Sequence, residues 1–221
     1  MENKRNFKKK DDFKKVFDTF HKDMITSTIE GFKKLEEFNM DSMPVTCVFL
    51  MPPDFDKHDH YAIMQLPIAE CFTDDVGKDV AEQIIMNAIE KGKPSAMFFA
   101  TEAYMALSNP DDKLFKELAR SKTLSHVPSE KMMDHKEKYK EHMRPSKLPP
   151  SHRLEILQMC CESEDRIIHN VYEIVNDDEK RWLNKIDSLS TEYTNEEDYS
   201  FKGRFIGKLF NHKNKKENAR E

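Results

Sequence analysis

Glycine is scarce in this sequence. Only 5 of the 221 residues are glycine, about 2% where roughly 7% is usual. Only Gly31, Gly77 and Gly92 precede the C-terminal tail. Loops that bind phosphate or nucleotides need closely spaced glycines, and the one glycine pair, at Gly203 and Gly207, has the wrong spacing and lacks the following Ser or Thr. The sequence therefore excludes the glycine-rich nucleotide-binding motifs.

Long apolar runs and paired cysteines are also lacking. No run approaches the ~20 apolar residues that a membrane-spanning helix needs, so no membrane contact is expected. Residues 1–12 are polar and rich in lysine, unlike a secretory signal peptide. The four cysteines form no C-x-x-C pair, which favours reduced thiols in a cytoplasmic protein.

The common catalytic motifs are missing as well. The sequence contains no G-x-S-x-G and no H-E-x-x-H. No cofactor is predicted, and whether the protein is an enzyme stays open at this point.

Charge is abundant and unevenly placed. Charged residues make up 35% of the chain, and the formal net charge is −5. Residues 1–15 carry a net +4 and residues 201–221 a net +5, so the 185 residues between them carry −14. Basic ends can contact phosphate or an acidic partner, or can simply keep the protein soluble. Both ends lack the aromatic and glycine interleaving of RNA-binding tails.

Hydrophobic periodicity predicts an α+β fold. Apolar residues three and four apart predict an amphipathic N-terminal helix over 12–38, with a possible break near Gly31. The helix at 73–92 has Thr73 or Asp74 as a candidate cap. The predicted strands are 44–51, 60–67, 95–105, 153–161 and 167–175, and a short helix is expected at 109–120. Residues 182–189 fit a helix or a final strand.

This element order predicts a single domain with a largely antiparallel sheet of about five strands and helices packed on one face. The expected organisation is a basic arm at 1–11, the α+β domain at 12–190 with a polar excursion at 121–150, and a tail at 191–221. The most apolar run, 95–105, is expected to be the central strand.

Three short motifs in the second half of the chain resemble those of a loose set of uncharacterised bacterial and phage proteins. They are Thr101–Met105 (TEAYM), Ser163–Arg166 (SEDR) and Gly203–Phe205 (GRF). The turn departs from that family's pattern, because Ile167 and Ile168 replace an Asp-Gly pair. The resemblance implies a shared fold and brings no assigned reaction.

Candidate metal ligands cluster between the first two predicted strands. Asp56, His58 and His60 alternate there, and imidazoles and carboxylates at this spacing can bind zinc or iron. The alternative is a solvated hairpin turn.

Two further positions could carry chemistry. Glu102 ends an apolar strand, and a buried carboxylate there could act as a general acid or base, or hold backbone amides or Arg153. Cys160 and Cys161 are adjacent on a strand and so point to opposite faces, and His169 is the candidate base for a thiol.

The tail contains a docking-like segment, residues 201–210. Its expected interaction residues, which combine apolar anchors with one cation, are Phe201, Arg204, Phe205, Leu209 and Phe210. They fit either packing against the protein's own body or insertion into a partner's groove.

These observations leave three functional hypotheses. The leading one is a non-catalytic accessory or interaction protein with a protein partner. The alternative is a hydrolase with a metal or acid–base site built from His58, His60 and Glu102. A weaker alternative is nucleic-acid contact through the basic termini, and the oligomeric state is not predicted.

Overall fold

A computed structural model describes residues 3–53, 60–106, 153–176, 180–194 and 204–210. Its elements, in chain order, are α1 (Asn3–Lys33), β1 (Thr46–Met51), β2 (Ala62–Leu66), η1 (Ala69–Thr73), α2 (Asp75–Gly92), β3 (Ala96–Ala106), β4 (Arg153–Ser163), β5 (Ile167–Asn176), β6 (Arg181–Lys185), η4 (Asp187–Leu189) and β7 (Thr191–Tyr193). The predicted helix at 109–120 and the polar excursion at 121–150 lie outside the described residues.

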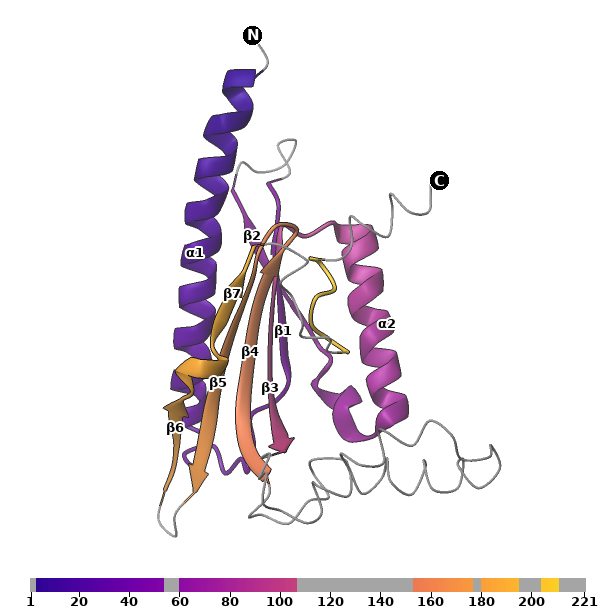
Figure 1. Ribbon diagram of the computed structural model, residues 1–221. Helices are drawn as coiled ribbons and strands as arrows, with labels where there is room; N and C mark the ends of the chain where they lie inside the picture. The colour runs from indigo at the N-terminus through magenta and orange to yellow at the C-terminus, as the bar shows by residue number, and fades with distance from the viewer. Residues whose placement is uncertain (1–2, 54–59, 107–152, 177–179, 195–203, 211–221) are drawn as a thin grey trace, which may run out of the picture.

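The strands form one antiparallel sheet in the order β2-β1-β3-β4-β5-β6, with β7 also paired to β5 (Figure 1). The α+β fold and the antiparallel sheet are confirmed. The apolar strand β3 lies between β1 and β4, as expected. The sheet has seven strands rather than about five, because the ambiguous segment near Trp182 forms β6 and the tail supplies β7.

The two helices cover opposite faces of the sheet, which corrects the prediction that both pack on one face (Figure 1). Adjacent side chains of a strand point to opposite faces, and in β3 Phe98 packs on the α1 side while Phe99 packs on the α2 side. Both rings are almost fully buried. A strand that is apolar at successive positions needs cover on both sides, so one helix packs on each.

The α1 helix is continuous over 31 residues and ends at Lys33, two residues after Gly31, while residues 34–39 form turns instead of the helix predicted as far as residue 38. Phe17 and Phe20, one turn apart, are buried against the sheet. The helix begins at Asn3, so residues 3–11, which were expected to form an arm, belong to it.

The α2 helix begins where the sequence suggested. The Asp74 side chain accepts a hydrogen bond of 2.6 Å from the backbone N–H of Gly77, so Asp74 is the cap. Ala81, Ile85 and Ile89 form the buried stripe that packs on β1 and β3.

Candidate functional site

Glu102 has a structural position at one end of the α1-covered face. Its carboxylate accepts a 2.8 Å hydrogen bond from the backbone N–H of Met43 and lies 3.3 Å from the guanidinium of Arg181. Arg181 also contacts Glu155 at 3.2 Å and lies over the Phe32 ring, 5.2 Å from its centre. One cation from β6 therefore joins β3, β4, β6 and α1, and Glu102 is engaged in holding that corner together.

The strand register separates the candidates for a hydrolase site. Extending the pairing of β1 with its neighbours places His60 beyond Met51 and Glu102 beyond Thr46, at opposite ends of β1. At about 3.3 Å per residue, roughly 30 Å lies between these two ends. His58 and Asp56 lie outside the described residues. Within the part of the chain that the structure describes, no three His, Cys, Asp or Glu side chains are grouped to hold a metal ion.

The thiols lie on opposite faces, as predicted. Cys161 packs on the α1 side, and Cys160 lies on the other side, opposite His169 in the β4–β5 register. Burial raises the pKa of Cys160 well above its usual value and lowers the pKa of His169 to about 4. An imidazole with so low a pKa is a weak base toward a thiol with so high a pKa, so this pair is not set up for nucleophilic catalysis.

The described part of the docking-like segment packs on the protein's own sheet. We call residues 204–210 the C-terminal strap. Phe205 stacks on Phe99 with ring centres 5.3 Å apart, and Leu209 and Phe210 are buried on the same face of the sheet. Arg204 and Lys208 form ion pairs with Asp79 and Glu82 of α2. Phe201 lies outside the described residues.

Glu162 anchors the strap and was missed as a site residue, since the strand predicted at 153–161 ended one residue before it. It lies at the end of β4, is fully buried, and its carboxylate accepts hydrogen bonds from the backbone N–H groups of Lys208, Leu209 and Phe210 at 3.3–3.4 Å. Burial raises the pKa of Glu162 to about 7, partly offset by these N–H groups. A charged residue directly after the largely apolar segment Leu157–Cys161 was the only signal in the sequence.

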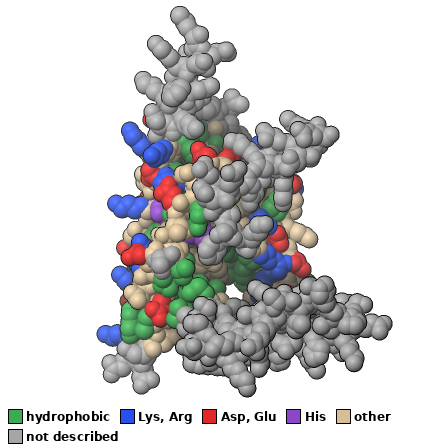
Figure 2. Space-filling model, viewed as in Figure 1, with side chains coloured by type: hydrophobic (Ala, Val, Ile, Leu, Met, Phe, Trp, Pro, Cys, Tyr) green, Lys and Arg blue, Asp and Glu red, His purple; other side chains and the backbone are tan. Residues whose placement is uncertain are grey.

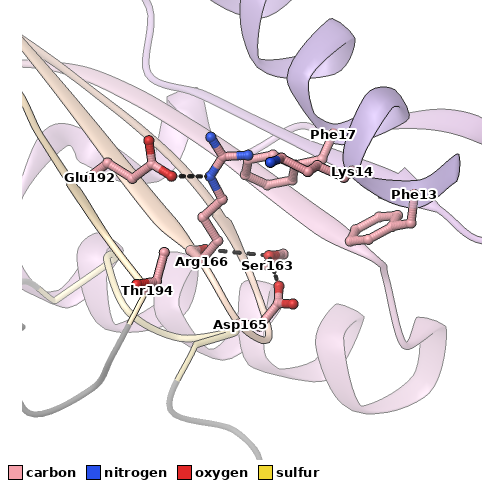
Figure 3. Close-up of a pocket in the computed structure, with 8 residues that line it drawn as sticks. All are labelled: Phe13, Lys14, Phe17, Ser163, Asp165, Arg166, Glu192 and Thr194. Atoms are coloured by element: carbon pink, nitrogen blue, oxygen red, sulfur yellow. Dashed lines mark hydrogen bonds and ion pairs between the residues drawn. The ribbon is translucent and has the colours of Figure 1, made fainter. Parts of the chain in front are cut away.

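A pocket of about 420 Å³ lies between α1, the β4–β5 turn and β7 (Figure 3). Arg166 reaches into it from the turn and is held by Asp18 of α1 at 2.6 Å and by Glu192 of β7 at 2.5 Å. Its guanidinium also lies over the Phe17 ring, 5.2 Å from the centre. The cation is thus neutralised from two sides and joins the helix to the sheet.

The pocket does not combine a nucleophile with a base. The Ser163 hydroxyl donates to the Asp165 carboxylate at 2.9 Å (Figure 3), and the nearby His21 ring is engaged with Asn170 at 3.0 Å. A serine is activated by an adjacent imidazole, which no described residue supplies here. The arrangement is suited to fixing α1 on the sheet.

We predict that Arg166→Met raises the pKa of His21. Burial and then the Arg166 charge lower this pKa, while Asp18 and Glu192 raise it, so removing the cation leaves the two carboxylates unopposed. In the wild type, the lowered pKa of His21 makes the free energy of unfolding decrease as the pH falls below about 6.5, the ordinary value for histidine. The Arg166→Met variant should lose less of its free energy of unfolding over the same pH range. NMR titration of the His21 ring checks the direction. Lys185→Met, which removes an exposed cation from β6, should leave His21 unchanged, and an unshifted His21 in Arg166→Met would contradict the prediction.

Among the described residues, α2 and the strap leave part of their face of the sheet without cover. A helix about 10 Å wide covers about two strands at 4.8 Å spacing, and α2 packs on β1 and β3. The strap covers Cys160 and Ile167. Figure 2 shows apolar side chains gathered at the surface over the lower ends of β5 and β6. Trp182 of β6, opposite Val175 in the register, is 43% exposed.

We call this region the Trp182 face. By strand alternation, its members are Leu154 and Ile156 of β4, Glu173 and Val175 of β5, and Trp182 and Asn184 of β6. The carboxylate of Glu173 accepts a 3.3 Å hydrogen bond from Asn184. The face therefore combines four apolar side chains, of which Ile156 is buried, with one amide and one acidic side chain.

Comparisons with known proteins find no matching family model, no similar curated protein and no similar solved structure. Among the described helices, none combines the length and the apolar character needed to cross a bilayer.

Proposed function

We propose that this is a non-catalytic interaction protein that binds a partner protein through the Trp182 face. The observation that carries the proposal is the 43% exposed side chain of Trp182 at the end of a sheet whose other apolar positions are mostly buried. An exposed tryptophan within an apolar patch is the residue type that contributes most to protein–protein binding. Glu102 and Ser163 are held in hydrogen bonds, and burial raises the pKa of the Cys160 thiol well above its usual value, so the states of these groups favour binding over catalysis.

The geometry favours an amphipathic helix as the bound segment. On this side of the sheet, the parts of β4, β5 and β6 beyond the strap span three strands, at least the width of the two strands, β1 and β3, on which α2 packs. A helix laid there would bury Trp182 and Val175 with apolar residues at i, i+3, i+4 and i+7. A Lys or Arg on its flank would complement Glu173, which pairs with no cation among the described residues.

Site-specific photo-crosslinking in cells tests the proposal. A photoreactive amino acid replaces Trp182 in one variant and Val76 in the matched control, because Val76 is 71% exposed on α2 and lies on another surface. We expect a discrete adduct with one partner protein at position 182 and none at position 76. Adducts of equal yield at both positions, or none at position 182, would contradict the proposal. An adduct between two copies of this chain would show that the Trp182 face binds a second copy rather than a different protein.

We predict that Trp182→Ala lowers the affinity for that partner by about 30-fold or more, because a central tryptophan contributes about 2 kcal/mol or more to an interface. Titration of the purified pair measures the change. The melting temperature should fall by little, since the side chain is half exposed. Val76→Ala is the control and should leave the affinity unchanged.

A further inference from the structure

The C-terminal strap is bound by a buried carboxylate rather than by a cation or by strand pairing. Three consecutive backbone N–H groups, from Lys208 to Phe210, point at the Glu162 side chain. The strap side chains hold it at two other places, through Phe205 on Phe99 and through the ion pairs to Glu82. Docking the strap is therefore the event that removes Glu162 from water.

We propose that the C-terminal strap is a proton-controlled latch on the sheet, closed when Glu162 is protonated and loosened when Glu162 is ionised. With the strap docked, Glu162 has no contact with solvent and pairs with no described cation, so its charged form bears the cost of desolvation. The three N–H groups of the strap favour the charged form, but at 3.3–3.4 Å these hydrogen bonds are long and offset only part of that cost. With the strap released, water reaches the carboxylate and the cost disappears. Ionisation therefore favours release. The proposal does not depend on the partner of the Trp182 face.

The groups around Glu162 indicate that Glu162 is the one whose charge changes when the strap docks. The titratable or charged groups that interact with it, with its neighbours in β4 or with the strap include Cys47 of β1, Cys160 and Cys161 of β4, Arg166 of the β4–β5 turn, His169 of β5, Asp79 and Glu82 of α2, and Arg204 and Lys208 of the strap.

None of these groups is placed to take over the switch. Burial raises the pKa of Cys47 to about 12 and lowers the pKa of His169 to about 4, so both are neutral between pH 5 and pH 8. The strap cations are paired with the carboxylates of α2. Arg166 is paired with Asp18 and Glu192.

The direction of the pH effect follows from linkage. The pKa of Glu162 is about 7 with the strap docked and returns toward its ordinary value of 4.5 when water reaches it. Docking then takes up a proton between these two values and weakens as the pH rises. These two values correspond to a docking constant that falls on the order of 70-fold from pH 5 to pH 8.

Amide hydrogen exchange on the full chain tests the latch, with protection factors corrected for the intrinsic pH dependence of exchange. In the wild type, protection of the strap amides should fall on the order of 70-fold from pH 5 to pH 8, while that of the β3 amides changes little. Glu162→Gln keeps an oxygen acceptor and removes the titrating group, so its strap protection should not vary with pH.

Glu82→Gln is the matched control, because it removes a charge that pairs with the strap without touching Glu162. Its strap should be less protected at every pH, with the wild-type slope retained. If Glu162→Gln fails to fold, the wild type and Glu82→Gln still decide the question. Strap protection that is constant or rises with pH, or that falls in parallel with β3, overturns the proposal.

Discussion

Phe98→Ala and Phe99→Ala are each expected to lower the free energy of unfolding by about 3–5 kcal/mol, the usual cost of deleting a buried phenyl ring. Both rings lie on the central strand and are at most 2% exposed. Each deletion leaves a cavity that the surrounding sheet cannot fill by small movements. A domain with only 5–15 kcal/mol of stability would be close to unfolding in either variant.

The two neighbouring substitutions should differ in what else they loosen. Phe98 packs on the α1 side, whereas Phe99 contacts Phe205 of the strap. Phe99→Ala should therefore reduce the protection of the strap amides beyond the global loss, and Phe98→Ala should not. Denaturant titration gives the stability, and hydrogen exchange gives the local effect.

Tyr104→Ala is the control on the same strand. Tyr104 is 39% exposed, and the guanidinium of Arg153 lies 4.4 Å from the centre of its ring, so we expect a loss below about 1 kcal/mol. A cost for Phe98→Ala or Phe99→Ala similar to that of Tyr104→Ala would show that the described core is not the one that stabilises the protein.

Gly77→Ala is expected to destabilise the protein by about 3 kcal/mol. A Cβ atom at this position would lie 2.1 Å from the backbone carbonyl oxygen of Cys71. Because the obstacle is backbone, it cannot turn away like a flexible side chain. The first turn of α2 would have to move away from η1, and the hydrogen bond from Gly77 to its cap Asp74 would be strained.

Gly31→Ala supplies the matched control, with the opposite sign. Gly31 lies within α1, and a Cβ there would approach no atom closer than 3.7 Å, the distance to Met43. Alanine is the better helix former by up to about 1 kcal/mol, so this variant should be slightly more stable than the wild type. Thermal unfolding of the two variants side by side checks both signs, and a neutral Gly77→Ala would disprove the close approach.

The local elements could be predicted because their signals are local. Alternating and continuous apolar runs identified the hairpin β1–β2 and the neighbouring strands β4 and β5, and Asp74 was a recognisable cap for α2. Glycine at position 77 had no such signal, because the reason for it is a carbonyl oxygen six residues earlier that approaches only when η1 folds back on α2.

The candidate sites were harder to predict, because a site depends on which strands become neighbours. His60 precedes β2 and Glu102 lies within β3 rather than at its end, and the register places the two residues beyond opposite ends of β1. Glu102 acquired its role from Arg181, 79 residues away, and Arg166 acquired its own from Asp18, 148 residues away. No local pattern encodes such pairs.

The scarcity of glycine, the charge distribution and the apolar periodicities were sufficient to determine an α+β chain with an antiparallel sheet and without a glycine-built nucleotide loop. Those properties follow from residue types and their spacing alone. The tertiary structure decided which face each helix covers, that Phe205 and Leu209 pack on the protein's own sheet, and that Glu162 is a buried carboxylate rather than a turn residue. Burial and the raised pKa of Glu162 arise from segments that meet only after the chain has folded, which is why they appear in the structure and not in the sequence.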